Sequence, residues 1–318
     1  MKTILAIDGG GVRGLMEAMI LRDIEKTIRA YEKYKVNLAY YFDVISGAST
    51  GGILAGILTC PDDRGNYKYD CSDAVTFYEK NCYDIFNKSK RMFGALTHKY
   101  SEKNLEKYLK KYFGDVKLKD LKNHVIIPTV DLNTSEAVFF SNIKKDDKYK
   151  NILVRDVLRF TSAAPTYFKP HTANGIIGID GGMVANNTSM CCIAKVRKYE
   201  KPKPRLKNIA LLNISSGSVK PNIKNLDTWN LLKWATNITN IMLYSNVGLV
   251  KYQTNTVQLG KNFNIDIPEK YRLYSQDMAD ASKKNMRLLV QAANNTISDY
   301  EDYIDKTAQF LIKNKKIL

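Results

Sequence analysis

The fold is decided by residues 41–58, which read YFDVISGASTGGILAGIL. An apolar run at residues 41–45 ends just before Gly47, as a buried strand does where it leaves a sheet. The apolar residues that follow recur with helical spacing, at Ile53, Leu54, Ile57 and Leu58. Between strand and helix lies a Gly-x-Ser-x-Gly pattern, in which Gly47 and Gly51 allow a sharp turn around Ser49. The placement predicts Ser49 as a nucleophile raised clear of the sheet, and favours this over a simple helix cap.

The alternation of strand and helix continues on both sides of this turn. Further strands are predicted at residues 3–7, 124–131, 176–179 and 209–214. Further helices are predicted at residues 14–34, 103–113, 152–160, 225–250, 277–294 and 298–313. Such alternation predicts an α/β protein, a three-layer fold with a mainly parallel sheet flanked by helices. The C-terminal part is expected to be mostly helical, and the chemistry is expected at the carboxyl ends of the strands.

A second glycine-marked turn, DGGGVRG at residues 8–14, joins the first predicted strand to the first predicted helix. It contains Gly-x-Gly-x-x-Gly, the pattern of a dinucleotide-binding turn. That interpretation needs an acidic residue at the end of the second strand, where the chain has Ile45 and Ser46 instead. We therefore interpret the turn as a run of backbone N–H groups at a helix start, able to hold a developing negative charge.

A third turn, Asp180-Gly181-Gly182, again ends an apolar run. Asp-Gly alone is a common turn, and its significance comes from the other two turns. A fourth block, SAAP at residues 162–165, precedes it.

These turns, in this order and at this spacing, resemble those of the patatin-like phospholipases. That family carries an Asp-Gly-Gly-Gly-x-Arg-Gly loop, a Gly-x-Ser-x-Gly elbow and a later Asp-Gly-Gly or Asp-Gly-Ala. The SAAP block resembles the Ser- and Pro-containing stretch between elbow and aspartate in the family. The resemblance spans roughly residues 2–216, and each motif is intact. It implies a patatin-like catalytic core at residues 1–220, with residues 221–318 as a mainly helical part packed on the same domain.

The resemblance implies a lipid acyl hydrolase of the phospholipase A or lysophospholipase type, with a Ser-Asp dyad of Ser49 and Asp180. The oxyanion hole it implies lies in the first loop and comprises Gly9, Gly10, Gly11, Arg13 and Gly14. Backbone N–H groups of Gly10 and Gly11 are the expected donors, and Arg13 is expected to fix the loop. The glycines of the other two motifs are Gly47 and Gly51 at the elbow, and Gly181 and Gly182 after the aspartate.

The three histidines, His98, His124 and His171, can be tested against this dyad. None follows the acid in the chain, as a triad histidine does in the usual hydrolase order, and His171 is expected in a surface turn. Asp180 must then accept the Ser49 proton directly. Because an aspartate with its ordinary pKa of about 3.9 is a poor base at neutral pH, we expect burial to raise the pKa of Asp180.

The charge of the chain is strongly basic, with 49 Lys and Arg against 32 Asp and Glu and a net charge of +17. Such a field attracts an anionic membrane surface or nucleic acid. Because no recognition helix, zinc finger or aromatic-rich strand motif is present, we expect a membrane phospholipid partner and no nucleic acid. A regulatory ligand and the oligomeric state stay open.

Metals, cofactors and membrane spans are not expected. No acidic cluster has calcium-loop spacing, and the five cysteines, which form no CxxC pair, are expected to be buried thiols. These cysteines are Cys60, Cys71, Cys82, Cys191 and Cys192. No window approaches about 18 consecutive apolar residues, and no signal peptide precedes the first strand. We expect a cytoplasmic, peripherally membrane-associated protein, with secretion by a route that uses no cleaved signal as the open alternative.

Residues 88–96, KSKRMFGAL, place basic residues beside apolar ones. They are a candidate membrane edge in which Met92, Phe93 and Leu96 enter the lipid interface, or a loop whose apolar residues pack inward. Three alternatives for the function stay open. They are an esterase or transacylase on neutral lipids, a lipase effector activated by a ligand at residues 225–318, and a basic nucleic-acid-binding protein.

Overall fold

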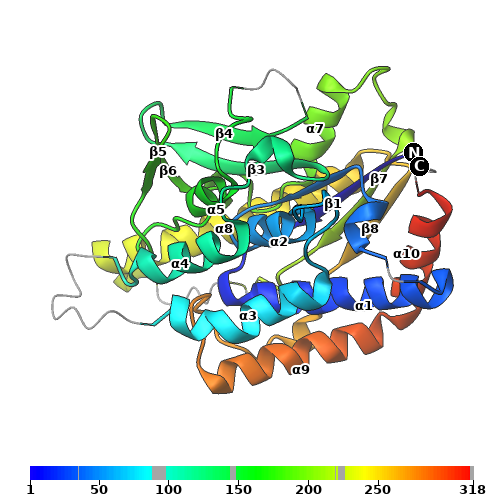
Figure 1. Ribbon diagram of the computed structural model, residues 1–318. Coiled ribbons are helices and arrows are strands. Elements are labelled where there is room, and N and C mark those ends of the chain that lie inside the picture. The colour runs from blue at the N-terminus through cyan, green and yellow to red at the C-terminus, as the bar shows by residue number, and fades with distance from the viewer. Residues whose placement is uncertain (35, 88–97, 144–147, 219, 221–225, 316–318) are drawn as a thin grey trace.

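The computed structural model describes residues 1–34, 36–87, 98–143, 148–218, 220 and 226–315, and shows a sheet between helices (Figure 1). Within these residues eight strands form one sheet in the order β5-β6-β3-β2-β1-β7-β8, and β4 pairs with β3 off this path. The strands are β1 (Lys2–Ile7), β2 (Val44–Gly47), β3 (His124–Asp131), β4 (Glu136–Ser141), β5 (His171–Ala173), β6 (Ile176–Asp180), β7 (Ile209–Ile214) and β8 (Lys261–Ile265). Neighbours from β3 through β8 along this order are parallel, whereas β4 and β6 run antiparallel to β3. The predicted α/β class with a mainly parallel sheet is confirmed.

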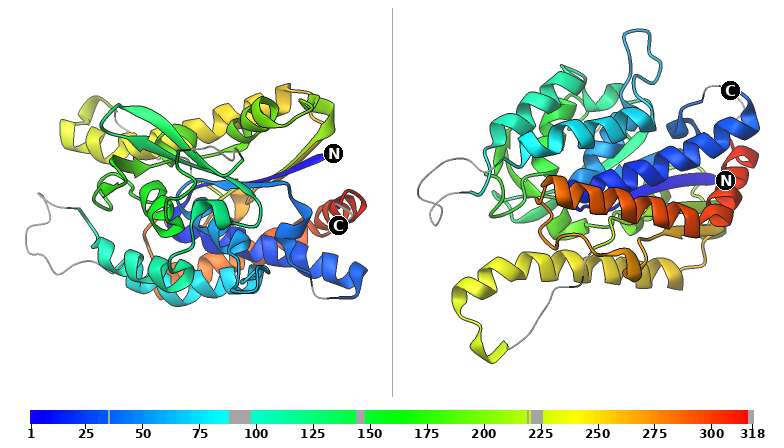
Figure 2. Two further views of the ribbon diagram at one scale, coloured as in Figure 1. Left: turned by 45° about the horizontal axis from the view of Figure 1, so that its top comes forward. Right: turned by 90° about the horizontal axis from the view of Figure 1, so that it is seen from below.

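Helices cover both faces of the sheet. They are α1 (Gly14–Glu32), α2 (Thr50–Thr59), α3 (Cys71–Ile85), α4 (Glu102–Phe113), α5 (Val154–Thr161), α6 (Gly182–Ala185), α7 (Ser189–Tyr199), α8 (Leu231–Thr256), α9 (Lys283–Asp299) and α10 (Glu301–Lys313). Figures 1 and 2 show α1, α3 and α9 on one side of the sheet and α7 on the other, with α8 packed against α6 and α7. Among the residues described, no helix combines the length and the apolar character needed to cross a membrane.

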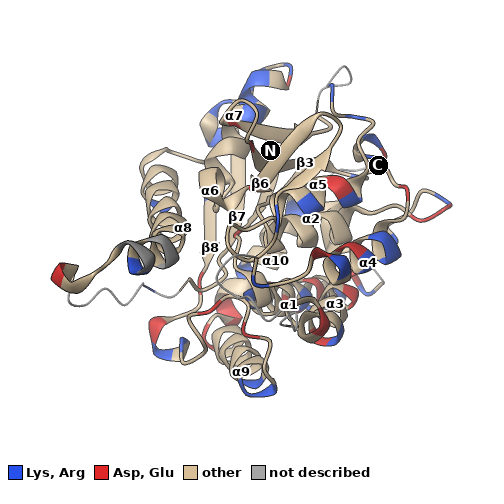
Figure 3. Cartoon of the chain, turned by 90° about the vertical axis from the view of Figure 1, so that its left-hand side faces the viewer, with Lys and Arg blue, Asp and Glu red and all other residues tan. Residues whose placement is uncertain are grey.

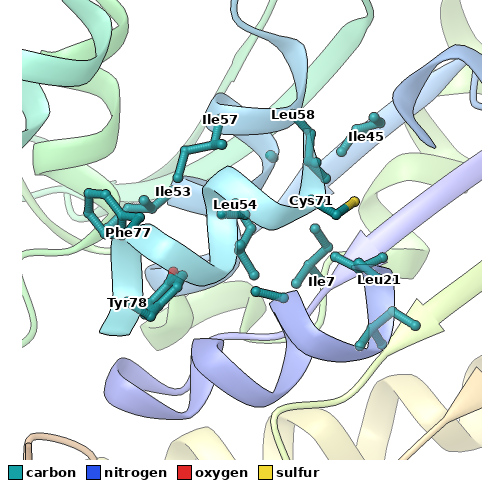
Figure 4. Close-up of a cluster of buried hydrophobic side chains, with 14 of the residues drawn as sticks. Ile7, Leu21, Ile45, Ile53, Leu54, Ile57, Leu58, Cys71, Phe77 and Tyr78 are labelled. Carbon is teal, nitrogen blue, oxygen red and sulfur yellow. The ribbon is translucent and has the colours of Figure 1, made fainter. Parts of the chain in front are cut away.

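The core lies on both faces of the central strands. In β1, Leu5 and Ile7 face the larger core beside α1, α2 and α3, whereas Ile4 and Ala6 face a smaller core beside α7. Burial on both faces explains why β1 and β7 are almost continuous apolar runs. Figure 4 shows part of the larger core, in which α2 contacts both the strands and α3. The side chains labelled there include Ile7, Ile45, Ile53, Leu54, Ile57, Leu58, Phe77 and Tyr78.

Two features of the region before residue 220 differ from the sequence prediction. The second strand begins at Val44 and not at residue 41, because residues 38–41 form the 3₁₀-helix η2 (Leu38–Tyr41). The Asn37 side chain starts η2 by accepting the N–H of Ala39. Helices α3 and α7 and strands β4 and β5 were not predicted, whereas β3 and β7 have the predicted bounds.

The region after residue 220 is mostly helical as predicted, and it also contributes a strand that was not predicted. Strand β8 pairs with β7 in parallel from Ala210 to Ile214 and extends the sheet at its edge. Its sequence, KNFNI, alternates polar and apolar residues over only five positions, which gives a weak signal within a helical region. Helices α9 and α10 both pack on α1.

Candidate active site

Ser49 lies in the turn between β2 and α2, and it is half-buried. Its backbone has φ 53° and ψ −121°, a region that residues other than glycine rarely adopt. The turn is held by two hydrogen bonds. The Ser49 N–H donates to Thr161 Oγ1 at 3.0 Å, and the Gly51 N–H donates to the Ala48 carbonyl at 2.8 Å. A strained serine in a fixed turn is the geometry expected of a nucleophile elbow.

The two glycines of this elbow are required by close packing of backbone. A Cβ added to Gly47 would lie 2.2 Å from the carbonyl carbon of Gly51. A Cβ added to Gly51 would lie 2.2 Å from the carbonyl oxygen of Ile7, at the end of β1. Neither position therefore admits a larger residue, because Gly47 packs against Gly51 within the elbow and Gly51 packs against the end of β1.

Strand register brings Asp180 to the same level as Ser49. In the parallel pair of β2 and β3, Ser46 is the partner of Ile126. In the antiparallel pair of β3 and β6, Asp180 is the partner of Thr129, three residues further along β3. Asp180, the last residue of β6, thus lies just beyond the carboxyl end of β2, where Ser49 begins the turn.

Asp180 is almost fully buried, with 4% of its surface exposed. Burial raises the pKa of Asp180 to about 7, while hydrogen bonds from the Gly182 N–H and from the Ser49 side chain act to lower it. The Gly182 N–H lies 2.7 Å from Oδ1. The Gly182 N–H therefore orients the carboxyl, and burial raises its pKa as expected from the sequence.

Thr161, at the end of α5, joins the two turns and was not predicted as a site residue. Its hydroxyl accepts the Ser49 N–H, and its carbonyl accepts the Gly181 N–H at 3.2 Å. The next residues of the SAAP block continue the contact, because the Asp180 N–H donates to the Ala163 carbonyl at 3.0 Å. This block therefore positions the aspartate turn against the serine turn.

The glycine loop lies beside Ser49, and its backbone N–H groups differ in what they contact. The Gly9 N–H donates to the Asn186 carbonyl at 3.1 Å, so Gly9 belongs to the loop without offering a free N–H. The N–H groups of Gly10 and Gly11 have no partner among the residues that the structure describes. Arg13 is buried and its Nε donates to the Gly10 carbonyl at 3.2 Å. Gly10 and Gly11 thus remain as free donors, on a loop that Arg13 holds.

The loop adopts its shape at Gly11, where φ is +60° and a Cβ would lie 2.1 Å from the Met278 carbonyl oxygen. The Gly14 N–H is occupied within the first helical turn, where it bonds to the Gly11 and Val12 carbonyls. Gly14 therefore serves the start of α1, and not as a donor.

Two further residues clamp this loop and have no distinguishing signal in the sequence. Asn186, just after α6, donates from Nδ2 to the Gly9 carbonyl at 3.3 Å. Ser216, after β7, donates from its hydroxyl to the same carbonyl at 2.9 Å. An isolated Asn or Ser in a loop gives no pattern, so only the three-dimensional contacts reveal them.

Two buried acids lie behind the loop. Burial raises the pKa of Asp8 to about 8, and Asn213 Nδ2 donates to its Oδ1 at 3.0 Å. Burial also raises the pKa of Glu17 in α1 well above its ordinary value, and the charge of Asp8 adds to this. Both carboxyls are 0% exposed, so they act on the loop and not on a bound molecule.

Ser49 stands between two cavities. The first is lined almost entirely by apolar atoms and includes side chains from α2, α3 and the segment after α5, namely Ile53, Phe77, Tyr78, Cys82, Tyr167 and Phe168. The second is smaller and borders Gly10, Arg13, Asp180 and Asn186, with Thr239 and Leu243 of α8 on its outer side. Ser49 therefore has an apolar cavity on one side and a more polar one on the other.

The three histidines lie away from the serine and line neither of these cavities. His98 is exposed, and His124 begins β3, at the end of the strand opposite the site. His171 is partly buried in β5 and not in a surface turn as predicted, with its Nε2 3.3 Å from Asp156 Oδ1.

All five cysteines are free thiols, and four are buried as predicted while Cys191 is half-buried. Among the described residues, no group of three or more His, Cys, Asp or Glu side chains could hold a metal ion. The predicted membrane edge, with Met92, Phe93 and Leu96, lies outside the described residues.

Comparison with known proteins gives a consistent family. The model of the family described as Patatin-like phospholipase matches residues 5–189. Patatin-like protein 1 of Arabidopsis thaliana is 31% identical over 291 residues, covering 80% of this chain and 70% of that protein. Patatin-like protein 2 of the same plant is 34% identical over 265 residues, covering 74% and 65%. Patatin-06 of Solanum tuberosum is 28% identical, covering 100% of this chain and 91% of its own length.

Among solved structures, VipD from Legionella pneumophila aligns with a TM-score of 0.38 at 11% identity, over 93% of this chain and 67% of that one. A likeness this distant does not bear on the function.

Proposed function

Since the chain belongs to the patatin-like phospholipase family, whose members are lipid acyl hydrolases, we propose that it cleaves fatty acyl esters of membrane phospholipids. We assign Ser49 as the nucleophile and Asp180 as its base. The observation that carries the proposal is that Ser49 lines an apolar cavity and also shares a second, smaller cavity with the buried carboxyl of Asp180.

In the first half-reaction, Ser49 Oγ attacks the ester carbonyl carbon while Asp180 takes the hydroxyl proton. The carbonyl oxygen becomes an oxyanion and accepts hydrogen bonds from the Gly10 and Gly11 N–H groups. Loss of one such donor typically costs about 3 to 4 kcal/mol in the barrier. The bond to the leaving alcohol then breaks, Asp180 returns the proton to that oxygen, and an acyl ester remains on Ser49.

In the second half-reaction, Asp180 takes a proton from water, and the resulting hydroxide attacks the acyl carbon. The same two N–H groups stabilise the second oxyanion. The bond to Ser49 Oγ then breaks, Ser49 regains its proton from Asp180, and the fatty acid leaves. The scheme uses groups of this chain only, so we propose that it needs no metal.

The two cavities support a division of the substrate between them. The apolar cavity suits the acyl chain, because burying methylene groups is favourable at about 0.8 kcal/mol each. The smaller cavity, which Arg13 and Asn186 border, is the side on which a polar head group would leave.

The test is fatty-acid release from vesicles of phosphatidylglycerol and phosphatidylcholine with a calcium chelator present. Ser49→Ala and Asp180→Asn should each abolish nearly all release and remain folded by circular dichroism. Ser72→Ala and Asp63→Asn are matched controls, because both residues are exposed and line neither cavity. Activity of Asp180→Asn close to wild type would refute the assigned base. Release from triglyceride or a small ester but not from phospholipid would favour an esterase or transacylase instead.

A further inference from the structure

Helix α8 has an apolar surface that the described residues of the protein leave exposed. Its exposed large apolar side chains, here called the α8 stripe, are Trp234, Ile238, Met242, Leu249 and Tyr252. Their exposed fractions are 42%, 42%, 41%, 54% and 70% respectively. Isolated exposed apolar residues are normal on proteins, but five on one helix need an explanation.

The stripe occupies one face of α8. Intervals of 4, 4, 7 and 3 residues between its members are close to whole turns of a helix at about 3.6 residues per turn. Ser245, which falls in the same row between Met242 and Leu249, is exposed as well. The row is therefore continuous over most of the length of the helix.

The opposite face of α8 reaches the active site. Thr239 and Leu243 border the smaller cavity beside Ser49 and Asp180. Asn246 accepts the Asn186 N–H at 2.9 Å and donates to the Val184 carbonyl at 3.0 Å, which ties α8 to the segment after Asp180. Helix α8 thus has an apolar outer face and an inner face that lines the smaller cavity of the site.

The charge around the stripe suits an anionic surface. No Asp or Glu occurs between Leu231 and Thr256, and the charged residues of α8 are Lys233 and Lys251. Figure 3 shows α8 at the edge of the molecule and almost without charged residues along its length, in contrast to α4 and α9. The chain as a whole has a net charge of +17.

We propose that the α8 stripe docks the protein on anionic lipid surfaces, with the apolar side chains in the interface and the cavity beside Ser49 next to the lipid. The inference rests on the proposed function, because a lipid surface is where that substrate is found. An amphipathic helix that lies in the interface plane buries such a face among head groups and acyl chains. Lysines that flank it add attraction to an anionic leaflet.

The first experiment measures binding to vesicles of equal parts phosphatidylglycerol and phosphatidylcholine by sedimentation, in a Ser49→Ala background that leaves the lipid intact. Combined Trp234→Gln, Ile238→Gln and Met242→Gln should weaken binding about tenfold or more. Leu132→Gln with Leu273→Gln is the matched control, since these side chains are 45% and 75% exposed and lie outside α8. Unchanged binding by the α8 variant overturns the proposal. The proposal is also overturned if wild type is a dimer, the α8 substitutions make the protein monomeric, and vesicle binding is unchanged.

The second experiment leaves the stripe intact and uses Trp234 as the probe. The chain has two tryptophans, so Trp229→Phe makes Trp234 the only one. Its emission should shift to shorter wavelength on these vesicles and be quenched by brominated lipid. A vesicle-bound protein whose Trp234 is neither shifted nor quenched overturns the proposal.

Hydrolysis of a soluble short-chain ester, with Ser49 restored, separates this inference from the proposed function. The α8 variant should retain this activity while losing vesicle binding. If wild type hydrolyses no ester but binds vesicles through the stripe, the docking surface stands and the proposed function fails.

Discussion

Replacing Asp180 by asparagine should abolish activity and stabilise the protein at the same time. Asparagine has nearly the shape of aspartic acid, and its side-chain oxygen can still accept the Gly182 N–H that now bonds to Oδ1 at 2.7 Å. It can neither ionise nor take a proton from Ser49. The same substitution therefore removes the proposed base and removes a charge from a site that is 4% exposed.

The magnitude follows from the pKa of Asp180, which burial raises from 3.8 to about 7. Below pH of about 4 the carboxyl is protonated in both the folded and the unfolded chain. Between pH 4 and pH 7 only the unfolded chain loses this proton, so the free energy of unfolding falls by about 1.4 kcal/mol per pH unit. The loss is complete above pH 7. The stability advantage of Asp180→Asn over wild type should therefore grow by about 3 kcal/mol between pH 5 and pH 8.

Two assays check this reasoning on the same proteins. Urea unfolding at pH 5 and pH 8 gives the stability difference between Asp180→Asn and wild type. Hydrolysis of a soluble short-chain ester by wild type should have a kcat/KM about a hundredfold lower at pH 5 than on the plateau above pH 8, because only the ionised carboxyl acts as base. A stability difference that does not change with pH, or a flat activity profile from pH 5 to pH 8, would refute the assignment of a raised pKa to Asp180.

Other parts of the site give three further predictions. Gly51→Ala should reduce ester hydrolysis by about tenfold or more, or prevent soluble expression, because its Cβ would lie 2.2 Å from the Ile7 carbonyl oxygen; wild-type activity would show that the elbow can relax. Glu17→Gln should stabilise the protein over wild type more at pH 8 than at pH 5, as measured by urea unfolding. Burial raises the pKa of Glu17, so the free energy of unfolding of wild type falls as the pH rises. Equal stabilisation at both pH values would contradict this. Cys82→Trp should fill part of the apolar cavity and lower kcat/KM for a 16-carbon ester relative to a 4-carbon ester by about tenfold; an unchanged ratio would exclude this cavity as the acyl site.

The turns that carry the site could be predicted because each is a local pattern. An apolar run followed by glycines and one polar residue occurs at Asp8, Ser49 and Asp180, and the structure has a strand ending at each. The central strands were equally visible, since burial on both faces makes them continuous apolar runs. Edge strands such as β8 were missed because they are short and half-buried, with polar residues at alternate positions.

The contacts between the turns could not be predicted in the same way. Asp180 reaches Ser49 through the pairing of β6 with β3, which depends on residues distant in sequence. Thr161 bonds to both turns, yet a threonine at the end of a helix has no distinguishing pattern. The contact of Gly9 could not be predicted for a related reason, because its N–H bonds to the carbonyl of Asn186, far along the chain.

The features that support chemistry here are locally unfavourable, and the rest of the fold has to stabilise them. Ser49 adopts a strained backbone, which typically costs about 1 to 3 kcal/mol. Asp180 is buried without a cationic partner among the causes that set its pKa, so its useful basicity and its instability have the same origin. Strands β1 and β7, buried on both faces, and the clamps from Thr161 and Arg13 fix these groups where solvent would otherwise relax them. A base of this kind works only inside such a frame, because exposure to water would return the carboxyl to its ordinary pKa and leave Ser49 without a proton acceptor at neutral pH.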